Sequence, residues 1–366
     1  MNSDLSRRDL MKAAGAAALV TPAFTAAQNK PWPPAETGVP KICLGLQGEV
    51  DAARMRRIKQ IGVDYVLMGG PPIPWTEADL RERMNRFKAN GLTIINMMIG
   101  GFPNTLFGKP GRDAEIEQVK QSIRAAGKVG LPVVEYNFYA HRIVEGYYEE
   151  LGRAGAGMTA FDYERIKNLP PLPEEGAHKL EEMWANITYF LKAIIPVAEQ
   201  SNVRMALHPN DPPAPISRGS EQIMATLAGW KRLVDIVKSP ANGITFDCGV
   251  TRELGEDPVA VARYFGARDQ INHVHYRNVI VRKPYIDYTE VFLDEGQVNM
   301  FAVMQELVRQ KYARGLYPEH PRALDYDRER EGSIVGQYAK AGGGGFGGEI
   351  YNVGYSKAML QAVLSQ

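Results

Sequence analysis

Residues 243–278 read GITFDCGVTRELGEDPVAVARYFGARDQINHVHYRN, and this stretch holds one full unit of the pattern that decides the fold. An apolar run at 243–249 is followed by a segment with helical spacing at 258–265 and by a second apolar run at 271–278. Neither run alternates strictly with polar residues, which is typical of strands buried on both faces of a parallel sheet. Asp257 stands where the N-cap of the helix is expected. The stretch therefore predicts two parallel strands joined by a helix.

The same alternation continues in both directions along the chain. Eight short apolar runs are predicted to be strands, at 41–47, 65–70, 93–100, 132–138, 204–210, 243–249, 271–278 and 315–320. Eight segments with helical spacing accompany them, at 52–61, 77–90, 114–130, 180–200, 220–238, 258–265, 300–310 and 355–364. Several of these segments end at a glycine, such as Gly62 and Gly130, and Asp113 stands where another N-cap is expected.

Eight strands alternating with eight helices predict an α/β fold, a (β/α)8 TIM barrel formed as a single domain by residues 41–366. The alternative is a doubly wound open sheet, but the regular repeats favour closure. No GxGxxG motif follows the first strand, so no dinucleotide site is indicated.

Two long segments interrupt the repeats, at 139–178 after the fourth strand and at 321–354 after the eighth. Active sites of this fold lie at the carboxyl ends of the strands, where both segments begin. They are therefore predicted to cover the substrate. The alternative is that they are disordered or contact another subunit.

The N-terminus has the order of a targeting signal. Arg7 and Arg8 precede an Ala-rich apolar stretch at 13–20, and small residues follow up to Ala27. This order resembles a twin-arginine (Tat) signal at residues 1–28, followed by a Pro-rich linker at 29–40. We therefore expect export to the periplasm or secretion. The alternative is an amphipathic N-terminal helix.

The composition excludes several classes of protein. The formal net charge is +1 and no block of basic residues stands out, so the sequence does not indicate a nucleic-acid-binding protein. No apolar run reaches the ~20 residues that a membrane span needs, so no stable membrane anchor is expected. The two cysteines, Cys43 and Cys248, are too few for a disulfide scaffold, and a bridge between them is not favoured. The sequence does not decide whether the chain forms a homo-oligomer.

Residues that bind metals gather at the ends of the last four predicted strands. They are His208 in the fifth, Asp247 and Cys248 in the sixth, His275 in the seventh, and Glu319 with His320 in the eighth. Because strand ends converge in a barrel, these groups are expected to meet in one place. Imidazole and carboxylate ligands together suit Mn, Fe, Co, Ni or Zn. The sequence therefore predicts a divalent metal site at the mouth of the barrel.

The neighbouring residues suggest further roles. Strand alternation puts His273, His275 and Arg277 on one face. An Arg277 that faces the barrel near a metal would bind a substrate carboxylate, and the alternative is an internal ion pair. His273 lies a layer deeper and is expected to be a core histidine whose hydrogen bonds are satisfied. Asp211 is positioned to orient a metal ligand.

Seven short motifs follow one another between Gly108 and His320. They are Lys109-Pro110-Gly111-Arg112-Asp113, Tyr136-Asn137-Phe138, Trp184-Ala185-Asn186, Ala206-Leu207-His208-Pro209-Asn210-Asp211-Pro212-Pro213, Ser239-Pro240-Ala241-Asn242-Gly243, His275-Tyr276-Arg277-Asn278 and Pro318-Glu319-His320. In these motifs the sequence resembles the bacterial mannonate dehydratase family, which is similar in fold to xylose-isomerase-like barrels. The resemblance implies a hydro-lyase that converts D-mannonate to 2-keto-3-deoxy-D-gluconate and water with Mn²⁺ or a similar ion.

The resemblance also implies roles for single residues. The family's ligands, His, Cys, His and Asp, fall on His208, the Asp247/Cys248 pair, His275 and Glu319. Strand six reads Phe-Asp-Cys-Gly where the family has Phe-Cys-Thr-Gly, so an ungapped alignment puts Asp247 at the ligand position. The family's catalytic acid/base falls on His320. A catalytic Tyr of the family falls on Phe346, and Tyr351 is the nearest substitute.

Two other functions stay open beside the dehydratase. A set of two His and two carboxylates resembles the metal site of the tagatose-epimerase-like barrels, which implies an isomerase or epimerase. Phe346, which lacks the hydroxyl, suggests a non-catalytic sugar-binding barrel. In each case the expected partner is a small-molecule sugar acid or keto sugar.

Overall fold

The computed structural model describes residues 38–329 and 341–366. The expected Tat-like signal at 1–28 lies outside these described residues, and so does the expected linker except for residues 38–40, which lead directly into the first strand. Among the described helices, none is long and apolar enough to cross a membrane.

Eight parallel strands close into a barrel in the order β1-β14-β11-β10-β7-β4-β3-β2. The strands are β1 (Lys41–Leu46), β2 (Tyr65–Gly69), β3 (Thr93–Ile99), β4 (Val133–Tyr136), β7 (Arg204–Leu207), β10 (Asn242–Asp247), β11 (Ile271–His275) and β14 (Gly315–Tyr317). The predicted TIM barrel is confirmed, and each predicted strand is present. Each strand ends one to three residues before its predicted end, since the chain leaves the sheet as it enters the loops at the barrel mouth.

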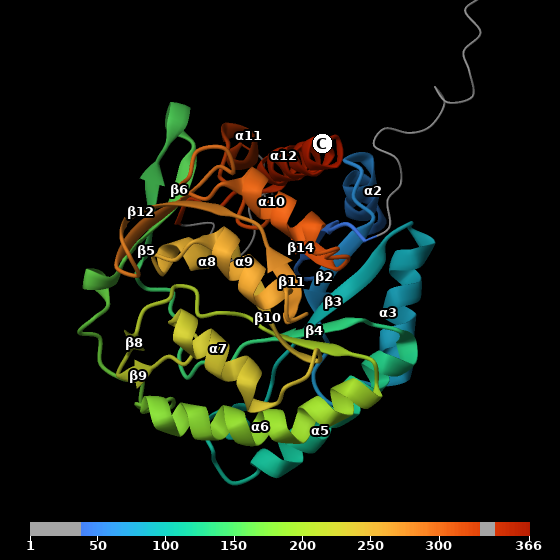
Figure 1. Cartoon of the computed structure of the whole chain (residues 1–366), viewed down its shortest axis with the longest axis vertical. Helices are drawn as coiled ribbons and strands as arrows, with labels where there is room; N and C mark the ends of the chain where they lie inside the picture. The colour runs from blue at the N-terminus through green and yellow to red at the C-terminus, as the bar shows by residue number, and fades with distance from the viewer. Residues whose placement is uncertain (1–37, 330–340) are drawn as a thin grey trace, which may run out of the picture. The chain divides into compact units, whose positions relative to one another are not determined.

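Within residues 38–329 and 341–366, eight longer helices accompany the strands, as Figure 1 shows for most of them. They are α2 (Ala52–Gln60), α3 (Glu77–Ala89), α5 (Arg112–Val129), α6 (Leu180–Gln200), α7 (Leu227–Ile236), α9 (Pro258–Gly266), α10 (Met300–Arg309) and α12 (Phe346–Leu364). Three short helices, α4 (Pro103–Leu106), α8 (Cys248–Glu253) and α11 (Asp325–Arg328), lie in the connections.

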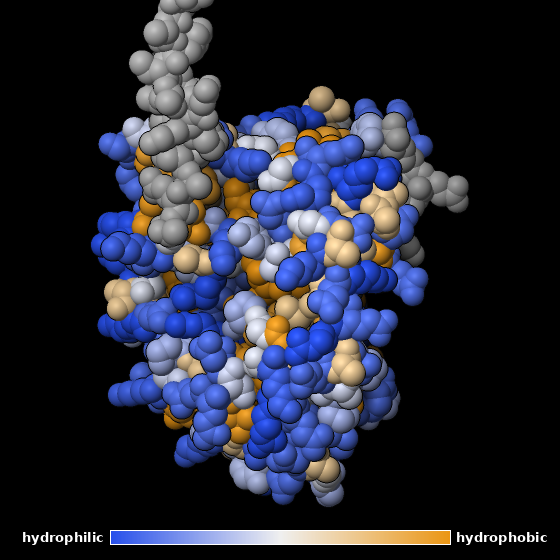
Figure 2. Space-filling view, turned by 90° about the vertical axis from the view of Figure 1, so that its right-hand side faces the viewer, coloured by the Kyte–Doolittle hydropathy of each residue, from blue (hydrophilic) through white to orange (hydrophobic). Residues whose placement is uncertain are grey.

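The helices bury one side against the barrel. In α6, Ile187, Phe190, Leu191 and Ile194 recur at the spacing of one helical face, and all four are fully buried. Burial of each such side chain stabilises the fold by roughly 1.5–3 kcal/mol. The face shown in Figure 2 is mainly hydrophilic, with hydrophobic residues visible in narrow strips between hydrophilic ones. The barrel core is thus shielded by amphipathic helices.

Three helix boundaries differ from the prediction. The helix expected from residue 220 begins at Leu227, where the Thr226 side chain caps it, and residues 220–221 form the small strand β9 (Ser220–Glu221) with β8 (Ile216–Ser217). The last helix begins at Phe346, nine residues earlier than expected. Asp113 is not an N-cap, because α5 begins at Arg112 after Gly111 in a left-handed conformation. The predicted cap at Asp257 is confirmed.

A second sheet that the sequence did not predict stands on the barrel. It has four antiparallel strands in the order β12-β13-β6-β5, namely β12 (Asn278–Lys283), β13 (Asp287–Val291), β6 (Gly157–Asp162) and β5 (Tyr147–Leu151). The hairpin β12–β13 follows β11, and β5–β6 belongs to the insertion after β4. Figure 1 shows β5, β6 and β12 together at the upper left. We therefore find the long insertion at 139–178 paired with a hairpin from another loop.

Buried polar and aromatic contacts fix this sheet in place. Asn278 donates from Nδ2 to the carbonyl oxygens of Leu293 (2.8 Å) and Val298 (3.2 Å), which ties the start of the hairpin to the segment that follows it. Tyr288 on β13 packs against Phe161 on β6, with ring centroids 5.2 Å apart. The sheet therefore holds the residues of β13 in a defined position at the carboxyl end of the barrel.

Candidate metal centre

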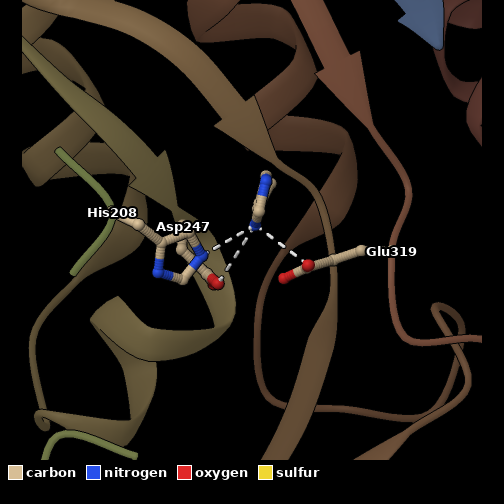
Figure 3. Close-up of side chains that lie close together, drawn as sticks. His208, Asp247 and Glu319 are labelled. Carbon is tan, nitrogen blue, oxygen red and sulfur yellow. Dashed lines mark hydrogen bonds and ion pairs between the residues drawn. The ribbon is translucent and has the colours of Figure 1, made fainter. Parts of the chain in front are cut away.

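Four side chains from the last four barrel strands converge at the mouth. His208 follows β7 directly, Asp247 and His275 are the last residues of β10 and β11, and Glu319 lies two residues after β14. One ligand atom from each lies within 4.8 Å of the others. Figure 3 shows the labelled side chains of His208, Asp247 and Glu319 pointing toward a common centre. Barrel closure thus assembles the group that the strand ends predicted.

The contacts centre on Nδ1 of His275. This atom lies 3.0 Å from His208 Nε2, 2.9 Å from a carboxylate oxygen of Glu319 and 4.0 Å from Oδ2 of Asp247. Asp247 and His275 are register partners on neighbouring strands, which brings their side chains to the same level. Asp247, His275 and Glu319 are buried, and His208 is half-buried.

The electrostatics of the group fit a divalent cation. Burial lowers the pKa of His275 well below its ordinary value, and nearby His208 lowers it further, so the imidazole is neutral and able to act as a ligand. Burial and the Asp247 charge raise the pKa of Glu319, because the two carboxylates face each other. Oε1 of Glu319 has an ion-pair contact with Nε of Arg277 at 3.2 Å but no hydrogen-bond partner among the described residues. The neutral His275, the imidazole of His208 and two crowded carboxylates are a donor set that a divalent ion satisfies.

Cys248 is not part of this group. The chain turns into the short helix α8 at Cys248, and Asp247 caps this helix by accepting from the backbone N–H of Val250 at 2.8 Å. The turn directs the Cys248 thiol away from the mouth, toward the carbonyl oxygen of Arg277 at 3.2 Å. Burial raises the pKa of this thiol, which disfavours the thiolate that a metal needs. Of the adjacent pair, Asp247 belongs to the converging group. Both cysteines are free.

Arg277 does not take the predicted position of a substrate clamp. Strand β11 ends at His275, and Arg277 is only 2% exposed. Its Nε lies 3.1 Å from Asp247 and 3.2 Å from Glu319, and its Nη1 lies 2.6 Å from Glu253. The alternative, an internal ion pair, describes the structure, because protein carboxylates occupy the guanidinium. Arg277 therefore pairs with both carboxylates of the metal group, those of Asp247 and Glu319.

His320 lies at the edge of the metal group. Its Nε2 is 3.6 Å from Oε2 of Glu319, and its Nδ1 is 2.8 Å from Oε2 of Glu290 on β13. Its backbone φ of 46° is in the left-handed region, which is uncommon for a residue other than glycine. The predicted acid/base histidine thus stands next to the metal group with its ring contacted on both sides.

Tyr351 and Phe346, the two residues considered for the position of the family's catalytic tyrosine, each contact residues outside the metal group. The Tyr351 ring packs on Phe292 at 5.2 Å between centroids, and its hydroxyl interacts with Arg153 and Asp294. Phe346 starts α12, and the guanidinium of Arg54 lies 4.6 Å from its ring centroid. Tyr351 is thus engaged in a small cluster of its own, which does not support the catalytic role expected from the sequence.

His273 lies a layer below His275, as predicted, but within the part of the chain that the structure describes it is not the hydrogen-bonded core histidine that the sequence led us to expect. It is fully buried, its ring packs edge-on against His275 at 5.2 Å, and neither ring nitrogen has a hydrogen-bond partner among the described residues. Burial lowers its pKa, which keeps the ring neutral. Glu135 lies beside this pair, 3.5 Å from His275 Nε2.

Sequence reasoning missed four charged residues around the site, namely Glu135, Glu253, Glu290 and Arg322. All four are fully or almost fully buried. Glu135 lies on β4 and Glu253 on α8, while Glu290 belongs to the unpredicted hairpin. Only Arg322 carried a signal, because it follows Glu319 and His320 within three residues.

The fold and the converging ligands define a metal-centred barrel enzyme of the xylose-isomerase-like kind. A model of the D-mannonate dehydratase (UxuA) family matches residues 157–343. A mannonate dehydratase of Enterococcus faecalis is 30% identical over 337 residues, which cover 80% of this chain and 92% of that protein. One of Streptococcus equi subsp. zooepidemicus is 29% identical over 323 residues, with coverage of 79% and 88%.

The solved structures agree with the family match. A mannonate dehydratase from Streptococcus suis serotype 2 superposes with a TM-score of 0.79 at 28% identity, covering 89% of this chain and 95% of that one. A D-psicose 3-epimerase from Clostridium cellulolyticum shares the fold alone, with a TM-score of 0.57 at 12% identity and coverage of 87% and 99%. The chain belongs to the mannonate dehydratase family, which makes it a hydro-lyase, and the resemblance read from its motifs is confirmed.

The choice between Asp247 and Cys248 can be tested by metal affinity. Asp247→Asn removes a formal charge from the four converging groups but keeps the side chain's shape and its cap on α8. We expect it to weaken Mn²⁺ binding by roughly a hundredfold in isothermal titration calorimetry. Cys248→Ser is the matched control and should change the affinity by less than about threefold, because the thiol faces a carbonyl. A large loss in Cys248→Ser with none in Asp247→Asn would contradict the assignment.

Proposed function

We propose that this chain dehydrates D-mannonate to 2-keto-3-deoxy-D-gluconate and water, with a divalent ion, Mn²⁺ in the first place, held by His208, Asp247, His275 and Glu319. The observation that carries the proposal is the position of His320. Its ring lies against the metal group, 3.6 Å from Glu319, so a group able to move protons stands beside the ligands. The family relatives, which are named mannonate dehydratases, supply the substrate.

The reaction is a β-elimination that moves two protons. The proton on C2 of the aldonate is removed, the C3 hydroxyl leaves as water after it gains a proton, and the resulting enol becomes the C2 ketone. In the metal group, a bound divalent ion would supply Lewis acidity that stabilises negative charge on the substrate's oxygens. His320 is the residue that we assign to proton movement, as the base for C2 or as the acid for the leaving hydroxyl.

The other residues of the site hold the ligands in place. Nε of Arg277 lies 3.1 Å from Asp247 and 3.2 Å from Glu319, and these contacts restrain the orientation of both carboxylates. Glu253 pairs with Arg277 at 2.6 Å and is itself fully buried, so the guanidinium cannot swing toward the mouth without leaving a buried carboxylate unpaired. We therefore assign Arg277 a positioning role in place of substrate binding.

One observation favours a second candidate, a sugar epimerase or isomerase on the same site. The ligand from β10 is Asp247, so the group consists of two imidazoles and two carboxylates. Removal of a proton next to a carbonyl, followed by its return, would give an isomer without loss of water.

The product separates the two candidates. We expect the Mn²⁺-loaded enzyme, offered a panel of aldonates and keto sugars, to form a keto-deoxy acid from D-mannonate, as followed by ¹³C NMR. Formation of an isomer from a keto sugar in the absence of any keto-deoxy acid would replace the dehydratase by an epimerase. Metal binding without turnover of any substrate in the panel would leave a sugar-binding barrel.

His320→Asn tests the proton-moving residue. Asn tolerates the left-handed backbone at this position, so the fold should persist. We expect kcat to fall by roughly 10²–10⁴-fold, with metal content by mass spectrometry close to that of the wild type. His178→Asn is the control, since His178 pairs with Glu182 at the start of α6 and should keep turnover. Full activity in His320→Asn would end this assignment.

We also propose that the chain is exported by the twin-arginine route to the periplasm or the medium. The support is the sequence alone, in which Arg7 and Arg8 precede the apolar stretch at 13–20. Replacement of both arginines by lysine is expected to keep the protein in the cytoplasmic fraction. Equal export of the two forms would exclude this route.

A further inference from the structure

A second group of polar side chains lies directly beside the metal group. It consists of Asp211, Glu290 and His320, whose ligand-type atoms lie within 4.8 Å of one another. Glu290 comes from β13, so this residue reaches the barrel mouth from the added sheet. The carboxylate of Glu290 is 1% exposed and lies 2.8 Å from Nδ1 of His320. The added sheet thus delivers a buried carboxylate to the far side of the histidine ring.

Arg322 forms hydrogen bonds with both Glu290 and His320. Its Nη2 lies 2.8 Å from Oε2 of Glu290, and its Nη1 donates to the backbone carbonyl of Glu290 at 3.2 Å. Its Nε and Nη2 donate to the backbone carbonyl of His320 at 3.0 and 2.7 Å. One buried guanidinium therefore locks the strained backbone of His320 to the strand that carries Glu290.

We propose that Glu290 is a positioning residue for the reaction, which holds His320 as the tautomer with its proton on Nδ1 and its Nε2 turned to the metal group. This inference rests on the proposed function. A carboxylate only accepts hydrogen bonds, so at 2.8 Å it selects a proton on Nδ1. The other nitrogen, Nε2, is then the one that can take a proton from the substrate. When it does, Glu290 stabilises the positive ring.

The charge state of Glu290 supports this role. Burial alone would raise the pKa of its carboxyl, but the charges of His320, Arg322 and Arg277 outweigh burial and lower it. The carboxylate is therefore ionised across the neutral pH range. An ionised carboxylate forms a stronger hydrogen bond to an imidazole N–H than a neutral acceptor does.

The same group does not favour a second metal ion. Oε2 of Glu290 already contacts His320 and Arg322 at 2.8 Å each. Asp211 accepts from the Tyr147 hydroxyl at 2.9 Å and lies 3.3 Å from the Arg277 guanidinium. Protein donors thus contact Asp211 and Oε2 of Glu290, which leaves Oε1 of Glu290 as the oxygen without a hydrogen-bond partner among the described residues.

Glu290→Gln in the Mn²⁺-loaded protein tests the proposal by kinetics. The Gln amide donates as well as accepts, so it no longer selects one tautomer, and it carries no charge. We expect kcat for D-mannonate to fall about a hundredfold, with KM and metal content within about threefold of wild type. Asp287→Asn, on the same strand but paired with exposed Arg282, is the matched control and should keep kcat. An unchanged kcat in Glu290→Gln, or a parallel loss of metal, would overturn the positioning role.

A double variant shows whether Glu290 acts through His320. In the His320→Asn background, Glu290→Gln is expected to lower the residual kcat by less than about threefold, since its effect needs the ring. A further hundredfold loss would mean that Glu290 acts independently. Arg322→Lys, which keeps the charge but loses the fork, provides a second approach should Glu290→Gln not fold. It is expected to lower kcat at constant KM. An unchanged kcat would contradict the role of Arg322 in holding Glu290 and His320 together.

The tautomer can also be observed without turnover. In protein labelled with ¹⁵N-histidine and loaded with Zn²⁺, the His320 signals are those that vanish in His320→Asn. We expect Nδ1 to carry the proton in the wild type and a mixture of tautomers in Glu290→Gln. A proton on Nε2 in the wild type would refute the pairing. Because this measurement needs no substrate, it separates failure of the pairing from failure of the proposed reaction.

Discussion

The guanidinium of Arg277 lies among five carboxylates, those of Asp211, Asp247, Glu253, Glu290 and Glu319, at distances from 2.6 to 3.9 Å. Two of the five belong to the metal group, and a third, Glu290, contacts His320. Buried carboxylates repel one another when they are ionised, and the buried guanidinium of Arg277 offsets this repulsion. The arrangement at the mouth of the barrel therefore depends on Arg277 staying paired inside the protein. For the same reason, this residue is not available to a substrate.

The site combines two structural layers. The barrel supplies the converging ligands from the ends of β7, β10, β11 and β14, which are fixed by the parallel register. The added sheet supplies Glu290, and Arg322 connects this sheet to the loop that carries His320. A rigid scaffold thus places the four converging side chains, and insertions at the loops complete the surroundings of His320.

The sequence predicted the barrel and the positions of the four converging ligands, because both follow from where apolar runs end. Arg277 was assigned the wrong role, since strand alternation was extended past His275, the last residue of β11, where the backbone no longer follows a strand. Glu290 and Glu253 were missed because no local pattern says which loop folds over the barrel mouth. The β12–β13 hairpin is stabilised by pairing with β6, more than 100 residues earlier in the chain, and such long-range pairing leaves no periodic signal. The choice between Asp247 and Cys248 depended on the turn into α8, which only the backbone geometry decides.

The selection of Asp247 over Cys248 has a chemical consequence. A thiolate that binds a metal is oxidised stepwise to sulfenic and sulfinic acids, and this route is not open to imidazole or carboxylate ligands. The four converging side chains contain no sulfur. The chain's two thiols, Cys43 and Cys248, are both completely buried. Oxidants in the surroundings would therefore find no accessible thiol at these two cysteines. A metal held by the four converging side chains would have no sulfur ligand that oxidation could remove.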